Sequence, residues 1–299
     1  MKHIAALTAL ILILLILTGC RTNHRSTLPE RLTLYLAQQQ RIITVTREEY
    51  LTGCILAYCD HSFQPESLKA AAAACCGHAV SVMRERSSGE FMGADLSDDP
   101  ERCPAWVNPE EALAEPDTEQ LLNSQKLAEA VEYAVLHCPE YGGEPAYTPV
   151  CRTSTGLTDS GGLPWLPSLE LPDDTSSPWY SSTCTVPAEY ARKALRDSTG
   201  SVILPPEVSD WFTDPEYTPG GVLTKIRFGT AKITGEQLRQ AFGLRSSAIT
   251  LTVSGEEITL TSRGCGGNTG MSAYSAERLA RSGMTADEIL QYFFPGITI

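Results

Sequence analysis

The stretch TREEYLTGCILAYCDHSFQPESLKAAAAACC, residues 46–76, decides the fold predicted for this chain. Thr46 and Glu49 have the Thr-x-x-Glu spacing of a capping box, which predicts a helix over residues 47–59. A proline then suits the first position of a second helix, and the alanine run behind it favours helix over residues 65–86. Because the connection is so short, the two helices should pack against each other as a hairpin.

Strand and helix patterns lie on both sides of this hairpin. Residues 31–45 alternate enough to predict two short strands, and helical periodicity returns over residues 118–137. The segment 148–184 is rich in Ser, Thr, Gly and Pro and carries Trp165 and Trp179, which favours a long functional loop over a linker. The other predicted elements are a helix over 187–196, strands over 222–228, 248–253 and 256–261, and helices over 271–281 and 285–294. Together they predict one α+β domain.

The first twenty residues are typical of an export signal. A short basic start precedes an apolar run over residues 4–17, which is shorter than the roughly 20 residues that a helix needs to cross a bilayer. The run ends in Leu17-Thr18-Gly19-Cys20, the order of a lipobox, so Cys20 is predicted to carry a lipid. An uncleaved signal anchor is the alternative, and both interpretations place the rest of the chain outside the cytoplasm.

This start divides the chain into three predicted parts. Residues 1–20 are a lipoprotein signal peptide, residues 21–30 a linker and residues 31–299 the domain. The protein is therefore predicted to be exported and anchored to the outer face of the cytoplasmic membrane. A net charge of -13 at pH 7 repels phosphate backbones, which argues against nucleic acid as a partner.

Cysteine is frequent for an exported chain, with ten residues. If Cys20 carries a lipid, an odd number remains, which requires a free thiol, an intermolecular bridge or surroundings that do not oxidise thiols. No two cysteines have the Cys-x-x-Cys spacing of a zinc ribbon or a thioredoxin motif. Several buried thiols with two or three disulfides would also explain the composition.

Two stretches far apart in the sequence resemble the stage II sporulation protein D family (SpoIID/LytB type) of peptidoglycan-acting proteins. Residues 49–79 are similar to the family's Glu-Tyr-x-x-Gly helix, short turn and second helix opening with Glu-x-Leu-Lys-Ala. Residues 263–296 are similar to its glycine-rich closing signature, a helix and a Tyr-Pro-Gly terminus. Weaker similarities at 153–156 and 235–246 keep the family's order, and four ordered segments are far more specific than one glycine-rich match.

The resemblance implies a fold and an activity. The fold is a single mixed α+β domain with a helical hairpin near the N-terminus, a small antiparallel sheet and two C-terminal helices. The activity is that of a lytic transglycosylase, which cuts peptidoglycan glycan strands stripped of stem peptides and works beside a cell-wall amidase and other sporulation membrane proteins. Such cleavage needs a carboxylic acid of raised pKa that protonates the glycosidic oxygen and then takes a proton from a sugar hydroxyl. No cofactor is implied.

The chain departs from the family at the position of that acid. The family has Glu at the end of the first helix, in Ala-Glu-Met-Pro, whereas this chain reads Ala57-Tyr58-Cys59-Asp60. A phenol with an ordinary pKa near 10 is a poor proton donor at neutral pH. The loop 95–106 holds zinc in some members, but here it has Ser97, Arg102 and Cys103, so no metal is predicted. Further departures are Gly267 for His, Ala273 for Gln, Cys151 for His, and Cys76-Gly77-His78 for Arg-Thr-Tyr.

The family match, and not periodicity, predicts which residues line a glycan groove. These residues are Tyr58, Glu66, Ser154, Arg263, Met271, Ser272 and Tyr274. Cysteine also stands at four positions where the family has other cleft residues, namely Cys59, Cys76, Cys151 and Cys265. We expect these four thiols to be neighbours that close or staple a former active site, by disulfide or by metal. Sulfurs more than about 10 Å apart would rule this out.

Other interpretations rest on single residues. Asp60 or Glu66 could replace the lost acid, although a first-turn Glu more often serves the helix dipole. His61 and His78 lie near thiols but match no metal or nucleophile spacing, and the turn 264–270 lacks the Lys-Ser/Thr of a phosphate loop. The sequence therefore predicts a glycan-binding or complex-forming cell-wall protein that is impaired in catalysis. An active lytic transglycosylase with a relocated acid and an unrelated surface adhesin are the alternatives.

Overall fold

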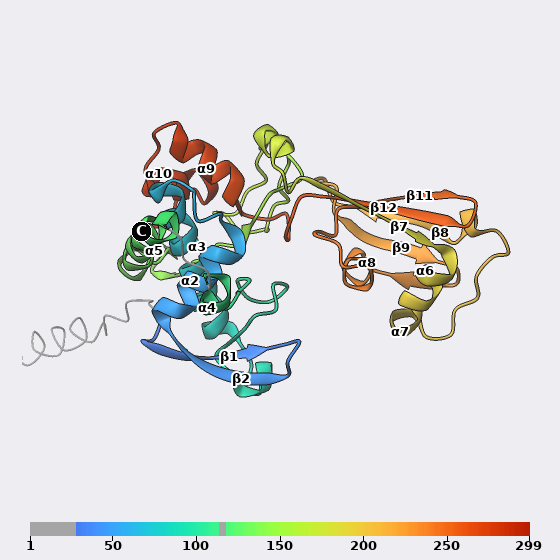
Figure 1. Cartoon of the computed structure of the whole chain (residues 1–299), viewed down its shortest axis with the longest axis horizontal. Helices are drawn as coiled ribbons and strands as arrows, with labels where there is room; N and C mark the ends of the chain where they lie inside the picture. Colours follow the sequence, from blue (N-terminus) through green and yellow to red (C-terminus); the bar gives the residue numbers. More distant parts are fainter. Residues whose placement is uncertain (1–27, 114–117) are drawn as a thin grey trace, which may run out of the picture.

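The buried apolar side chains gather in two cores. The computed structural model describes residues 28–113 and 118–299, so the predicted signal peptide, Cys20 and most of the linker lie outside the described residues. One core draws on residues 28–171 and 271–299, and the other on residues 184–260. Figure 1 shows them as two lobes side by side, which we call the helical lobe and the strand lobe. In the described ranges no helix is long and apolar enough to span a membrane.

The predicted hairpin forms the centre of the helical lobe. It consists of α2 (Arg47–Tyr58) and α3 (Pro65–Glu85). The capping box is complete, because Thr46 Oγ1 accepts the Glu49 N–H at 3.1 Å and Glu49 Oε2 accepts the Thr46 N–H at 2.7 Å. The alanine run of α3 is fully buried, which lets α2, α5, α9 and α10 pack closely around it. The other helices of the lobe are α4 (Pro109–Ala112), α5 (Thr118–Leu136), α9 (Ala273–Arg281) and α10 (Ala286–Phe293).

A close approach explains the glycine of the Glu-Tyr-x-x-Gly pattern. A Cβ on Gly53 would lie 2.2 Å from Trp106 Nε1 and 2.4 Å from the Val107 carbonyl oxygen. Tyr50, one turn earlier, is fully buried in the core. The pattern therefore fixes α2 against the chain segment that leads to α4.

The short strands of the helical lobe tie its segments together. They are β1 (Arg31–Leu36), β2 (Arg41–Thr46), β3 (Leu96–Ser97), β4 (Glu140–Tyr141), β5 (Glu144–Pro145), β6 (Val150–Cys151) and β13 (Met271–Ser272). β1 pairs antiparallel with β2 and parallel with β3, and β4 pairs with β5. β6 pairs in parallel with β13, which joins the chain entering the strand lobe to the chain leaving it.

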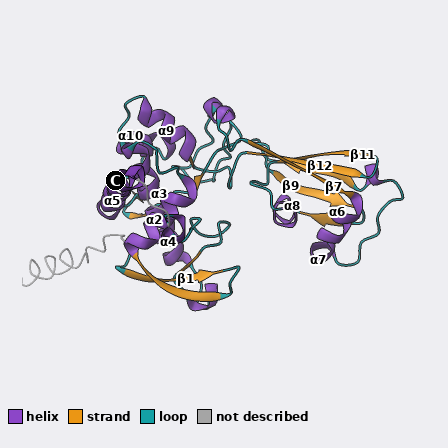
Figure 2. Ribbon diagram, viewed as in Figure 1, coloured by secondary structure: helices purple, strands orange, loops and turns teal. Residues whose placement is uncertain are grey.

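The strand lobe contains two three-stranded antiparallel sheets (Figure 2). Their orders are β11-β12-β7 and β10-β9-β8. The strands are β7 (Ser181–Pro187), β8 (Phe212–Tyr217), β9 (Leu223–Phe228), β10 (Ala231–Ile233), β11 (Ile249–Ser254) and β12 (Glu257–Arg263). The helices are α6 (Ala188–Ala194), α7 (Arg196–Thr199) and α8 (Gly235–Phe242).

The α+β class is confirmed, with the helical hairpin, antiparallel sheets and two C-terminal helices. The prediction of a loop over residues 148–184 is wrong in part, because this range holds β6 and the start of β7. The side chains of β7 are mostly polar, so its sequence does not indicate a strand, but every residue of β7 pairs with β12. The helix predicted over 187–196 divides into α6 and α7 at Leu195. The helix predicted from 271 starts at Ala273, because the two residues before it pair with β6.

Candidate functional site

A cavity of about 390 Å³ lies between the two lobes, and we call it the interlobe cleft. The helical lobe supplies the end of α2, the loop 100–105 and Arg152. The strand lobe supplies the start of β9, the start of α8 and the segment 245–247, while the turn 265–267 lines it between the lobes. Gly266 in this turn has φ near +110°, and a Cβ there would lie 2.9 Å from the Cβ of Cys151. The glycine therefore allows the turn to lie against β6.

Tyr58 lines the cleft at the end of α2 with 7% of its surface exposed. Its hydroxyl oxygen accepts the Ala105 N–H at 2.7 Å, and its carbonyl oxygen accepts the Arg152 Nε–H at 3.2 Å. Burial, together with the neighbouring Cys75 thiol, raises the pKa of the phenol well above its ordinary value. Tyr58 is therefore neutral and a very weak acid near neutral pH.

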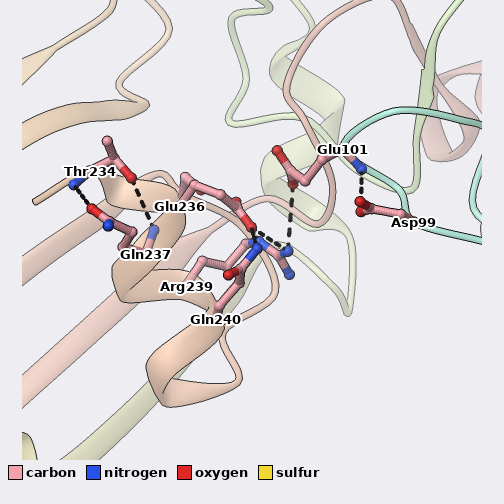
Figure 3. Close-up of polar contacts among 8 residues, drawn as sticks. Asp99, Glu101, Thr234, Glu236, Gln237, Arg239 and Gln240 are labelled. Atoms are coloured by element: carbon pink, nitrogen blue, oxygen red, sulfur yellow. Dashed lines mark hydrogen bonds and ion pairs between the residues drawn. The ribbon is translucent and has the colours of Figure 1, made fainter. Parts of the chain in front are cut away.

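Two carboxylates and one arginine meet across the cleft (Figure 3). Arg239 on α8 holds Glu236 through two hydrogen bonds of 2.7 and 2.6 Å. The same guanidinium reaches Glu101 of the helical lobe at 3.5 Å. The backbone N–H of Glu101 donates to Asp99 Oδ1 at 3.1 Å, which fixes the loop that carries it. These polar contacts link the two lobes.

The two carboxyl groups differ in acidity. Burial, and then the negative charge of Glu236, raise the pKa of Glu101 to about 7. Burial also tends to raise the pKa of Glu236, but the hydrogen bonds and charge of Arg239 outweigh it and lower that pKa. Near neutral pH the pair therefore tends to hold one proton on Glu101, as expected when two carboxylates interact. A carboxylic acid with a pKa near the working pH suits proton transfer.

Two further arginines stand over an exposed tryptophan beside the cleft. The guanidinium of Arg152 lies 4.1 Å from the centre of the Trp179 ring, and that of Arg245 lies 5.0 Å from it. Both arginines line the cleft, and Trp179 is 38% exposed. Among the residues that the structure describes, neither arginine forms an ion pair with a carboxylate.

A buried aspartate organises the chain below the cleft. Asp174, in the 3-10 turn Pro172–Ser176, is fully buried. It accepts hydrogen bonds from the Ser154 N–H at 2.7 Å, the Ser272 hydroxyl at 3.0 Å and the Ser275 hydroxyl at 2.7 Å. The three donors belong to the loop after β6 and to the start of α9. Asp174 therefore joins the chain segment that precedes the strand lobe in the sequence to the segment that follows it.

Known proteins match most of this chain. The sequence profile of the family described as "Stage II sporulation protein" matches residues 35–135, which include the hairpin and the loop of Glu101. The chain is 27% identical over 278 residues to the stage II sporulation protein D of Bacillus subtilis (strain 168), which covers 91% of this chain and 79% of that protein. The chain is thus similar to stage II sporulation protein D over most of its length. It is also 26% identical over 284 residues to the protein of the same name from Bacillus amyloliquefaciens, with the same coverage.

In this relative of stage II sporulation protein D, the residues predicted to line a groove lie in different surroundings. Tyr58 lines the interlobe cleft. Ser154, Met271 and Ser272 are fully buried, and both serines bind Asp174. These three residues therefore hold the fold together beneath the cleft. Their contact with a glycan stays a prediction.

The other three predicted groove residues are held by neighbouring segments or exposed. Glu66 pairs with Lys69 at 2.7 Å and accepts the Ala286 N–H at 2.8 Å, so it fixes the start of α10. The Tyr274 hydroxyl donates to the carbonyl oxygen of the last residue of the 3-10 turn at 3.4 Å, and Arg263 is exposed at the end of β12. The contact of these three residues with a glycan also stays a prediction.

The nine cysteines in the described ranges are free thiols. Cys76 Sγ lies 2.9 Å from the Sγ of Cys138, a residue outside the predicted four-thiol cluster. Cys151 belongs to β6. Cys265 forms an isolated antiparallel β-bridge with Thr153, two residues after Cys151. In the described part of the chain, no group of three or more potential ligands could hold a metal ion. The staple of Cys59, Cys76, Cys151 and Cys265 stays a prediction.

Sequence reasoning missed the charged residues that dominate the cleft. Glu101 and Arg239 are 138 residues apart in the sequence, and no local pattern connects them. One signal was available for α8, because Thr234 and Gln237 have capping-box spacing and form that box. It would have placed Glu236 and Arg239 on one helix, but not opposite Glu101.

Proposed function

We propose that this chain binds peptidoglycan glycan strands in the interlobe cleft during the cell-wall remodelling of sporulation, and that residue 58 takes no part in proton transfer. Similarity to stage II sporulation protein D supports the process. The polymer is the one implied by the sequence motifs that resemble those of peptidoglycan-acting proteins. The observation that carries the proposal is Tyr58, which stands in the cleft at the family's acid position with its hydroxyl bound to the Ala105 N–H. The phenol retains a binding surface while lacking the acidity that cleavage requires.

The composition of the cleft suits an extended sugar polymer. Residues from both lobes line it, and they include hydroxyl, guanidinium and carboxylate groups that can bind sugar hydroxyls and acetamido groups. Binding without cleavage would make the chain a pseudoenzyme that recruits or positions other wall proteins.

The direct test combines binding with product analysis. Purified full-length chain is incubated with soluble glycan strands freed of stem peptides, binding is measured by calorimetry, and the strands are then analysed by mass spectrometry. We expect binding without 1,6-anhydro sugar ends. Anhydro ends at a level above a protein-free control would overturn the non-catalytic part of the proposal, and the absence of binding would overturn all of it.

Replacing Tyr58 by the family's acid should restore some cleavage. In Tyr58→Glu a carboxyl group would occupy a buried position, where desolvation raises its pKa toward the range of a general acid. Anhydro ends should then appear in the mass spectrum. Tyr58→Gln is the matched control, since it has the same size and no acid. Equal, background levels of anhydro ends in both variants would show that the cleft cannot support cleavage from this position.

A second candidate function, active lytic cleavage with a relocated acid, is favoured by Glu101. The two carboxylates first considered for this role are poor acids, because hydrogen bonds from Ser62 outweigh burial and lower the pKa of Asp60, and Lys69 and the Ala286 N–H do the same for Glu66. Glu101 lines the same cleft as Tyr58, and its pKa is raised to about 7 by burial and by Glu236. It has the acidity that protonation of a glycosidic oxygen needs.

This candidate predicts a specific loss. If wild-type chain produces anhydro ends, Glu101→Gln should remove them by a factor of about a hundred or more, the usual contribution of a general acid. Wild-type cleavage should also fall as the pH rises above about 7, since the protonated carboxyl is the active form. Glu189→Gln, at an exposed carboxylate of α6 that does not line the cleft, is the control that keeps activity. Cleavage that survives in Glu101→Gln would exclude this residue as the acid.

Location and partners are also part of the proposal. A lipid on Cys20 would hold the cleft at the outer face of the membrane, within reach of the wall. A cell-wall amidase would supply strands free of stem peptides, and other sporulation membrane proteins would complete the assembly.

A further inference from the structure

Arginines converge on one side of the cleft in a chain whose net charge is -13. Arg152, Arg239 and Arg245 all line it. Cys265 lines the same cavity, and the guanidinium groups of Arg152 and Arg245 stand over one ring, that of Trp179. Burial raises the pKa of the Cys265 thiol, and the positive charges of all three arginines oppose that rise. An acidic protein with a local positive cleft is arranged to receive an anion.

The three arginines are not equivalent. Arg239 is neutralised by its paired hydrogen bonds to Glu236. Arg152 uses its Nε–H on the Tyr58 carbonyl, which leaves the other N–H groups of its fork without a carboxylate partner in the described chain. Contact with the Trp179 ring restrains the guanidinium groups of both Arg152 and Arg245. These two arginines are therefore restrained before any ligand arrives, and each can bind a carboxylate through two parallel hydrogen bonds.

We propose that Arg152 and Arg245 bind the lactyl carboxylate that a muramic acid residue exposes once its stem peptide has been removed. This proposal rests on the proposed glycan-binding function and names the group that is recognised. In an intact strand the lactyl carbonyl belongs to a neutral amide, and hydrolysis of that amide gives a free carboxylate. An N-acetylglucosamine residue has no such group. The two arginines therefore select muramic acid over N-acetylglucosamine, and a bare strand over one that carries peptides.

The test varies the ligand before it varies the protein. Calorimetry on the purified full-length chain compares three probes: denuded glycan strands, the same strands with their lactyl carboxyl groups converted to methylamides, and an oligomer of N-acetylglucosamine of similar length. We expect the affinity for the first probe to exceed that for the other two by about tenfold or more, as for a charge-assisted hydrogen bond. This difference should shrink as the salt concentration rises.

Substitutions then locate the effect. Arg245→Gln should lower the affinity for denuded strands to near that for the methylamide, with no change for the N-acetylglucosamine oligomer. Arg152→Gln should do the same, but because Arg152 also binds Tyr58, circular dichroism must confirm that the variant is folded. Arg192→Gln is the control, since Arg192 is exposed on α6 and pairs with Glu189.

The outcomes distinguish a failure of the carboxylate site from a failure of glycan binding. Equal affinity for all three probes would overturn the carboxylate site and leave glycan binding intact. Discrimination that persists in Arg245→Gln and folded Arg152→Gln would place carboxylate recognition elsewhere and also overturn it. A chain that binds none of the probes would overturn both this inference and the proposed function.

Discussion

At the scale of single residues, burial gives two acids of the same cleft opposite properties. Tyr58 is almost fully buried, and desolvation moves the pKa of its phenol further from neutrality. Glu101 is partly buried beside a second carboxylate, and the same effect brings its pKa to about 7. Arg239 does not reverse this shift, because it lies closer to Glu236 than to Glu101. Of these two residues, Glu101 is therefore the better suited to donate a proton near neutral pH.

Glu101 predicts a pH-dependent stability. Its pKa in the folded chain, about 7, exceeds the unfolded value of about 4.3, so its contribution is fully present below the unfolded value and is lost as the pH rises through about 7. Glu101→Gln cannot ionise and avoids this loss. The melting temperature of the variant minus that of the wild type should therefore increase between about pH 5 and about pH 8. Differential scanning calorimetry checks this, and a constant difference would contradict the raised pKa.

At the scale of elements, strong local signals were predictable and long-range pairings were not. The capping box at Thr46 and the alanine run of α3 act through neighbouring residues, so sequence alone located the hairpin. β7 was missed because its side chains are polar, and it is a strand only because β12 pairs with it. β8 and β10 likewise depend on pairing with β9. The cleft residues were missed for the same reason, since the loop of Glu101 meets α8 only in the folded chain.

The packing of α2 on Trp106 gives a prediction for Gly53→Ala. Alanine favours helix by roughly 1 kcal/mol, but its Cβ would lie far inside contact distance of the Trp106 ring, and such overpacking costs about 3 kcal/mol. We expect the free energy of unfolding to fall by about 2 kcal/mol in a urea titration. Thr52→Ala, the neighbouring position on the same helix, is the control and should change it little. An equally stable Gly53→Ala would show that α2 and this segment are not closely packed.

At the scale of the whole molecule, two lobes joined at β6 and β13 place a cleft between separate cores. Each wall of the cleft is carried by its own core, so residues from distant parts of the sequence can face one ligand. The prediction of α+β structure was correct, and β9, β11 and β12 were predicted as strands. The second core was not foreseen, because strand patterns do not show which elements pack together in the folded chain. The predicted anchor at Cys20 precedes the described residues and stays a prediction.

The anchor itself can be tested on whole cells. If Cys20 carries a lipid, wild-type chain grown with labelled palmitate should be labelled and sediment with membranes. Cys20→Ser should lose the label, while Cys184→Ser, a cysteine of the strand lobe, should keep it. An unlabelled wild-type chain that still sediments with membranes would favour an uncleaved signal anchor.

The central claim is that glycan binds in the cleft between the lobes, and hydrogen exchange measured with and without denuded glycan strands tests it most directly. Bound glycan should slow exchange in the loop 99–106 and in the turn 264–268, whose residues line or adjoin the cleft. Unchanged exchange in both segments under saturating glycan, or protection confined to other surfaces such as α5, would contradict it.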